Sequence, residues 1–255
     1  PILKLGALAE LQLICMTFDR SYGQALIEVT RMADIESLEE LLRAMADPNS
    51  SKAENGTTPL ILASHGGDMQ IVQFLCESGA DKDKAMDDGV TPLFVAAFNG
   101  HCEVIKYLCE NGAQKEKPKR DGLTPLHVAA YNGDLAVVQC LCELGTDMDR
   151  TGQDGITPVC LASSEGHLKI VQSLYKSRAD IIKPMLDGAT PLLTASETGH
   201  LEVVNFLLDA LPCKDLRRND GSTALYMAAQ NGHEVVVRCL LSSTVDTNES
   251  REDGS

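Results

Sequence analysis

Short apolar runs alternate with short polar segments along most of the chain, and the alternation is regular between residues 53 and 245. In one copy the apolar residues fall at i, i+1, i+3, i+4 and i+5, as in Val137, Val138, Cys140, Leu141 and Cys142. This spacing predicts an amphipathic helix that buries one face. Each copy has room for two such helices, both shorter than the ~12 to 15 residues that an isolated helix needs in water. The helices must therefore be stabilised by packing against other copies.

The pattern has a fixed period. Thr-Pro-Leu or a close variant of it recurs at intervals of 33 residues, beginning at Thr58, Thr91, Thr124, Thr157, Thr190 and Thr223. Six copies without an insertion predict a repeat protein rather than a single large core. An aromatic content of 4% without Trp, together with abundant Ala, Leu and Gly, agrees with closely stacked small helices.

Local chemistry explains each copy. An Asn-Gly or Asp-Gly dipeptide lies two residues before each Thr, and Gly tolerates the positive φ of a tight turn. Thr suits a helix N-cap and Pro suits the first helical position, so the first helix must begin there. Glycines at 67, 100, 133, 166, 199 and 232 then predict its end after about two turns.

The segment "DGLTPLHVAAYNGDLAVVQCLCELGTD" resembles an ankyrin repeat, and the resemblance covers residues 53 to 245. It implies an all-α solenoid of paired antiparallel helices with projecting β-hairpin fingers, where each finger is the loop that precedes a Thr-Pro-Leu. The His that usually follows Thr-Pro-Leu is present only as His127, so its hydrogen bond to Thr is missing from five copies. Arg178, Leu211 and Thr244 replace the second-helix Gly in the last three copies.

The segments outside the six repeats are less regular. Residues 25–52 lack Thr-Pro-Leu, but their apolar residues lie on one face, which predicts an atypical capping repeat. Residues 1–24 form an N-terminal extension. They resemble the last strand of a ubiquitin-like domain weakly, and the alternative is an extension packed on the first repeat. Pro1 in place of Met suggests a processed chain or a fragment. Residues 246–255 form a polar tail that we expect to be disordered.

The last repeat predicts a further contact, because the segment from Val235 to Leu241 is as apolar as an internal copy. A terminal repeat normally has a polar outer face. We therefore expect additional sequence or another domain to cover this segment.

The net charge restricts the partners of the chain, and the cysteine content indicates its compartment. The net charge of −15 would repel nucleic acid and an anionic membrane surface. No apolar stretch reaches the ~20 residues of a membrane span. Nine cysteines without a secreted-scaffold spacing, and no visible signal peptide, predict reduced thiols in the cytoplasm, with the nucleus as an alternative.

Histidines and cysteines recur at fixed repeat positions, so metal binding and catalysis must be considered. His101, His167, His200 and His233 follow the first-helix Gly, but helices ~8 to 10 Å apart cannot share a zinc ion at ~2 Å. We expect these side chains to bond loop backbone. Cys76, Cys109 and Cys142 share a position that elsewhere holds Tyr or Leu, which indicates packing. No phosphate loop, nucleophile elbow or zinc-protease motif occurs. We therefore predict no catalytic residue, metal or cofactor.

Specificity must lie at positions that the repeat leaves variable. One of them, called the variable position below, ends the first helix and reads His65, Phe98, Tyr131, Ser164, Glu197 and Gln230. The resemblance places it on the concave groove. We predict an aromatic centre at Phe98 and Tyr131, about 10 Å apart and flanked by Asn99 and Asn132. The alternative is that both rings fold back on a neighbouring helix.

The fingers differ in character. "DKDKAMDD" is mixed and acidic, "QKEKPKRD" is basic, and "DIIKPMLD" carries Met185 and Leu186. Lys119 and Arg120 would suit an acidic peptide, or form an ordinary solvated surface. The prediction is a monomeric scaffold or adaptor that binds a protein or peptide and is not an enzyme. The alternatives are a regulatory or targeting segment of a larger enzyme, channel or ubiquitin-linked adaptor, and a structural spacer.

Overall fold

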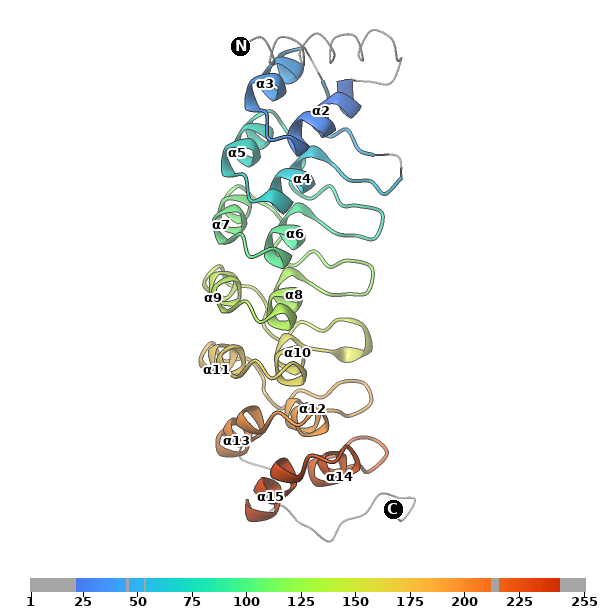
Figure 1. The fold of residues 1–255 in the computed structure, drawn as a ribbon, viewed down its shortest axis with the longest axis vertical. Helices are drawn as coiled ribbons and strands as arrows, with labels where there is room; N and C mark the ends of the chain where they lie inside the picture. Colours follow the sequence, from blue (N-terminus) through green and yellow to red (C-terminus); the bar gives the residue numbers. More distant parts are fainter. Residues whose placement is uncertain (1–21, 45, 53, 212–215, 244–255) are drawn as a thin grey trace. The chain divides into compact units, whose positions relative to one another are not determined.

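A computed structural model describes residues 22–44, 46–52, 54–211 and 216–243. The chain divides into two compact units, residues 1–120 and residues 121–255, and each is described by itself. Across the described residues the regular structure consists of fourteen α-helices, α2 to α15, and one short 3-10 helix (Figure 1). The all-α fold class predicted from the sequence is thus confirmed.

The described residues of the first unit form three helix pairs. Its helices are α2 (Tyr22–Arg31), α3 (Ile35–Arg43), α4 (Pro59–Gly66), α5 (Met69–Glu77), α6 (Pro92–Phe98) and α7 (Cys102–Glu110). Within each pair the two helices pack on each other, and the first helices α2, α4 and α6 also contact one another in order. α2 begins at Tyr22, so the pair at the start of this unit is formed by residues 22–43.

The second unit contains four helix pairs. Its helices are α8 (Pro125–Asn132), α9 (Leu135–Glu143), α10 (Pro158–Ser164), α11 (Leu168–Lys176), α12 (Pro191–Thr198), α13 (Leu201–Ala210), α14 (Ala224–Gln230) and α15 (Glu234–Ser242), with the 3-10 helix at Gln153–Gly155. First helices pack on first helices, and second helices on second helices. Two layers of helices result, with the fingers projecting beside the first-helix layer (Figure 1).

Threonine caps begin the first helices, as the sequence predicts. The hydroxyl oxygen accepts the backbone N–H three residues later at Thr58, Thr91, Thr157, Thr190 and Thr223. Thr124 differs, because it forms a reciprocal capping box with His127. The caps in the five copies without His are therefore satisfied by the helix backbone itself.

Glycines end the first helices in the left-handed conformation, for example Gly67 and Gly133 at φ of 72° and 79°. The second helices are followed by a left-handed Gly at 79, 112 and 145. Arg178 takes the same conformation at φ 72° although it carries a Cβ. Leu211 at the same repeat position is extended instead, with φ −88°, so the left-handed turn is kept without Gly at Arg178 but not in the following copy.

The core is built from small residues facing large ones. The alanine pair in α6 and that in α8 have no exposed surface, and the Leu that follows each Pro is buried beside them. Small side chains allow neighbouring helices to approach closely, while the leucines fill the space between the layers. The first-helix ends at Phe98 and Tyr131 lie outside this packed core and are exposed.

The fingers are turns rather than β-hairpins. Backbone hydrogen bonds close them, such as Met86 N–H to Val90 O and Met185 N–H to Ala189 O, both 2.8 Å. Among the described residues they contain no strand, only one isolated bridge between Arg217 and Thr223. The projecting loops were predicted correctly, but their strand character was not, because two or three paired residues are too few for a ladder.

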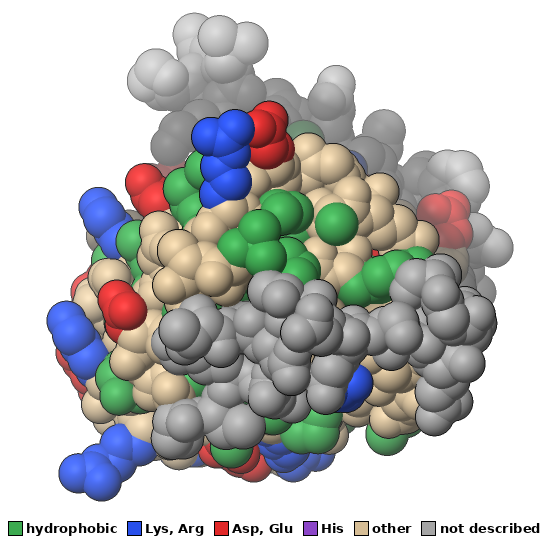
Figure 2. Space-filling view, turned by 90° about the horizontal axis from the view of Figure 1, so that it is seen from below, with side chains coloured by type: hydrophobic (Ala, Val, Ile, Leu, Met, Phe, Trp, Pro, Cys, Tyr) green, Lys and Arg blue, Asp and Glu red, His purple; other side chains and the backbone are tan. Residues whose placement is uncertain are grey.

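The end of the second unit exposes apolar side chains. Val235 and Leu241 of α15 are 62% and 47% exposed, and hydrophobic side chains gather on the face seen from this end (Figure 2). The expectation that further structure covers this face stays a prediction. The expectations for the N-terminal extension and for the polar tail fall on residues 1–21 and 244–255, outside the described residues.

Candidate functional site

The variable position carries exposed aromatic side chains in both units. Phe98 is the last residue of α6 in the first unit and is 55% exposed, and Tyr131 near the end of α8 in the second unit is 51% exposed. Neither ring is buried against a neighbouring helix of its own unit. The two residues belong to separately described units, so their predicted separation stays a prediction.

The other members of the variable position are polar. His65 and Gln230 are exposed, and Ser164 and Glu197 are partly buried. Asn99, which follows Phe98, caps α6 by donating its side-chain N–H to Val95 O at 2.8 Å. Asn132, which follows Tyr131, is exposed at the end of α8. Asn99 thus has a structural task beside any contact with a partner.

The basic finger of the first unit is largely engaged within the protein. Lys117 Nζ donates to Asp83 O at 2.6 Å, and Lys119 Nζ lies 5.9 Å from the centre of the Phe94 ring. The Arg120 backbone N–H binds Asp88 O, while its side chain is exposed. The sequence pattern shows the charges of this finger, but it does not reveal these internal contacts. Arg120 is therefore the most accessible of the cations that the sequence singled out here.

Lys117 belongs to a recurring contact between fingers. Lys84 donates to Asn49 O and Lys183 donates to Asp149 O, both at 2.6 Å. Each Lys therefore links its finger to the preceding one. A spacing of 33 residues between Lys84 and Lys117 is the signal that could have revealed a structural task for these lysines.

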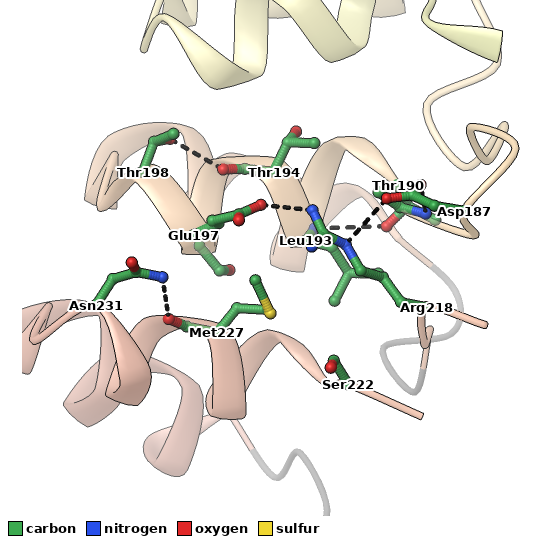
Figure 3. Close-up of polar contacts among 12 residues, drawn as sticks. Asp187, Thr190, Leu193, Thr194, Glu197, Thr198, Arg218, Ser222, Met227 and Asn231 are labelled. Carbon is green, nitrogen blue, oxygen red and sulfur yellow. Dashed lines mark hydrogen bonds and ion pairs between the residues drawn. The ribbon is translucent and has the colours of Figure 1, made fainter. Parts of the chain in front are cut away.

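Glu197 is held by an arginine that the sequence analysis did not single out. Arg218 donates from Nη2 to Glu197 Oε2 at 2.5 Å, and its Nε lies 3.5 Å from Asp187 Oδ2 (Figure 3). Arg218 comes from the finger before α14, whereas Glu197 lies on α12 and Asp187 on the preceding finger. The predicted contact residue Glu197 is thus half of an internal ion pair, and a partner would meet a neutralised carboxylate.

The four histidines after the first-helix Gly bond backbone, as predicted, but the acceptors are carbonyls at the ends of first helices rather than in loops. In the first unit the Nε2 of His101 lies 3.0 Å from His65 O. In the second unit the Nε2 atoms of His167, His200 and His233 lie 2.9 to 3.0 Å from the carbonyl oxygens of Tyr131, Ser164 and Glu197. Each imidazole therefore satisfies a carbonyl at the end of the preceding first helix. Their chemistry is structural.

His127 is fully buried and neutral. Its Nδ1 accepts the Thr124 backbone N–H at 3.2 Å, and its Nε2 lies 3.1 Å from Ile156 O. Burial lowers the pKa of His127 from 6.5 to about 4, because the charged imidazolium would lose its hydration. A histidine in this environment holds two loops together and is inaccessible to a substrate.

The thiols are poor nucleophiles in this fold. Burial raises the pKa of Cys76, Cys142 and Cys160 above the ordinary value of 9.0. The thiolate is the reactive form, so a raised pKa makes these side chains less reactive at neutral pH. Within the described residues no group of three or more His, Cys, Asp or Glu side chains could hold a metal ion.

The comparisons with known proteins agree with this geometry. The family model described as ankyrin repeats (3 copies) matches residues 26–119, 114–185 and 178–251. The chain belongs to the ankyrin-repeat family. Ankyrin repeats are generally protein–protein interaction modules and are typically non-catalytic. A search of the curated proteins found no match. In the part of the chain that the structure describes, no helix has both the length and the apolar character needed to cross a bilayer.

Proposed function

We propose that this ankyrin-repeat chain is a scaffold or adaptor, which binds a protein or peptide through the variable position and performs no catalysis. The observation that carries the proposal is the exposure of Phe98 and Tyr131 at a position where the repeat does not require an aromatic residue. Other copies place His, Ser, Glu or Gln there. An exposed ring that the fold does not need is a typical interface anchor.

The two rings are well suited to this task. Phe98 and Tyr131 extend from helix ends whose backbone is fixed by a capping Asn99 and by the His167 contact to Tyr131 O. A side chain on a fixed backbone loses little conformational entropy when a partner covers it. An aromatic anchor buried by a partner can contribute about 2 kcal/mol or more, whereas an exposed ion pair contributes less than about 1 kcal/mol.

Charge supports a protein partner over nucleic acid. The chain carries 37 acidic and 22 basic residues, and of the basic finger Lys117 and Lys119 are held by internal contacts. Arg120 could still guide an acidic segment of the partner, which would affect the association rate more than the affinity. We expect the chain to act as a monomer in the cytoplasm, or in the nucleus.

The test is quantitative pull-down from cell extract with each aromatic residue replaced singly. Phe98→Ala and Tyr131→Ala should each reduce recovery of specific partners by about tenfold or more, because an anchor worth 2 kcal/mol corresponds to roughly 30-fold in affinity. Gln73→Ala and Gln139→Ala are matched controls at one exposed position of the second helices α5 and α9, one in each unit, and should change recovery less than about twofold. Circular dichroism would confirm that all four variants fold.

Equal recovery of every partner by the aromatic variants and the controls would show that the variable position is not the binding surface. A chain that recovers no specific partner would instead favour the structural spacer.

A second candidate function is a regulatory or targeting segment of a larger enzyme, channel or ubiquitin-linked adaptor. It is favoured by the exposed Val235 and Leu241 of α15, which a neighbouring domain could cover. Sequencing the transcript tests it. A reading frame that continues past Ser255 into a catalytic or membrane domain would support this candidate, and a stop codon there would reject it for the C-terminal side.

A further inference from the structure

One finger of the second unit presents apolar side chains to solvent. Along residues 180–187 the side chains of Asp180, Ile182, Pro184 and Leu186 are exposed, and these four residues are called the row below. Ile182 is 43% exposed and Leu186 is 75% exposed. Ile181, in contrast, is buried. Ile181 therefore packs inside the protein, while Ile182 and Leu186 of the same finger are exposed to solvent.

Other fingers carry polar residues at the same two repeat positions. The residues equivalent to Ile182 are Asp83, Glu116 and Asp149, and those equivalent to Leu186 are Glu54, Asp87, Arg120, Gln153 and Asn219. The acidic residues have a structural use, because Asp149 accepts the backbone N–H of Asp180 at 2.7 Å and Asp83 accepts that of Gln114 at 2.9 Å. Ile182 cannot accept such a bond. The fold therefore does not call for aliphatic residues at these positions.

The finger holds these side chains on a fixed backbone. Leu186 donates its N–H to Asp154 O at 2.9 Å and accepts from the Asn219 side chain at 2.8 Å. The Ile182 N–H binds Asp180 Oδ1 at 3.0 Å. Because both ends of the row are anchored, covering it would require little ordering of the backbone.

Exposed carboxylates lie beside the row. Asp180 and Asp187 border it, and Asp154 lies on the neighbouring finger. Lys183 binds Asp149 O and Arg218 pairs with Glu197 and Asp187, while Arg178 and Arg150 are exposed as well. The net charge of −15 adds a long-range attraction for basic molecules. A partner that covers the row thus meets an apolar strip bordered by carboxylates.

We propose that the 180–187 finger is a docking site for a basic, amphipathic segment of a protein, in which Leu or Phe side chains cover Ile182 and Leu186 while Lys or Arg side chains face Asp180 and Asp154. This site deepens the proposed function, since it rests on the chain being an interaction module. Its aliphatic residues lie on a finger rather than on a first helix, and Arg218 links this finger to the variable position through Asp187 and Glu197.

The test uses the full chain and three synthetic, fluorescein-labelled peptides. One alternates Leu or Phe with Lys or Arg, the second has Glu in place of the basic residues, and the third has Ser in place of the apolar ones. Binding is measured by fluorescence anisotropy, and the contact is located by methyl NMR at Ile182 and Leu186. The double variant Ile182→Asp/Leu186→Gln introduces the residues found at Asp149 and Gln153, so it should fold normally.

The basic apolar peptide should bind the chain at least about tenfold more tightly than the other two, and should shift the Ile182 and Leu186 methyl signals. The double variant should bind it at least about tenfold more weakly, although Ile182→Asp adds a negative charge that would strengthen a purely electrostatic attraction. Equal binding by the variant, equal binding of the Glu peptide, or no binding at roughly millimolar peptide would each overturn the proposal.

Tyr131→Ala separates this proposal from the function proposed above. That variant should keep its affinity for the basic apolar peptide within about twofold while it loses partners in the pull-down. If the pull-down shows no effect of the aromatic residues but the peptide still binds at the finger, only the function of the variable position is rejected. If partners depend on Tyr131 and the peptide does not bind, only the finger proposal is rejected.

Discussion

The buried imidazole of His127 should make the second unit less stable at mildly acidic pH. In the folded protein this side chain has no exposed surface, accepts a hydrogen bond from Thr124 and binds Ile156 O. Its pKa is lowered from 6.5 to about 4 by burial. The unfolded chain binds the proton more readily than the folded one, so stability must fall as the pH falls.

The size of the effect follows from the two pKa values. The stabilisation is fully present above 6.5 and is lost as the pH falls from 6.5 to about 4. Between about pH 8 and about pH 5.5 the loss is about 1.4 kcal/mol, and it approaches about 3.4 kcal/mol below pH 4. At pH 5.5 the folded protein is still neutral at His127, so the loss there depends almost entirely on the unfolded state.

The assay compares the wild type with His127→Leu by urea unfolding at about pH 8 and about pH 5.5, followed by circular dichroism. Leucine occurs at the equivalent position as Leu193, so the fold accepts it. The variant should be less stable at pH 8 by about 0.5 to 1.5 kcal/mol, because the contact of the imidazole with Ile156 O is lost while the Gly152 N–H still binds that oxygen. Its further loss on acidification should be about 1.4 kcal/mol smaller than that of the wild type.

A matched control is Phe94→Leu, which makes the equivalent replacement in a copy without a histidine at this position and should leave the pH dependence unchanged. If the wild type and His127→Leu lose the same stability on acidification, His127 is not neutral and buried, and the reasoning fails.

Positions with left-handed backbone yield two further predictions for the same unfolding assay. Arg178→Gly should stabilise the protein by about 1 kcal/mol, because a left-handed residue with a Cβ costs about 1 to 2 kcal/mol and Gly regains only part of this. A lower unfolding midpoint would contradict it. Gly133→Ala should cost at least about 1 kcal/mol more than Gly232→Ala, because its Cβ would lie 2.7 Å from the His167 ring whereas nothing lies within 4 Å of the other. Equal losses would show that only the positive φ matters.

The repeat architecture was predictable because its signals are local. Thr58 and its equivalents define where each first helix begins, and Gly67 and its equivalents define where it ends, each through the conformation of one or two residues. A period of 33 residues then requires the copies to pack on one another. The sequence left open whether Phe98 and Tyr131 fold back on a neighbouring helix, and only the structure shows that both are about half exposed.

Contacts between fingers were not predictable from single copies. The link from Lys117 to Asp83 O and the pair of Arg218 with Glu197 join residues 34 and 21 positions apart. They depend on how neighbouring fingers lie in space, which a local pattern does not encode. The left-handed conformation of Arg178 was not predicted either, because Arg itself disfavours the conformation that packing imposes on it.

The residue that follows each first-helix Gly also determines whether a copy is stabilised internally or linked to its neighbour. Asp68 and Asp134 cap their own helix, whereas His167, His200 and His233 each bond the helix of the preceding copy. An Asp therefore adds to the intrinsic stability of one repeat, and a His adds to the coupling between nearest neighbours. We therefore expect the last copies of the second unit to exchange their amide hydrogens together rather than one by one.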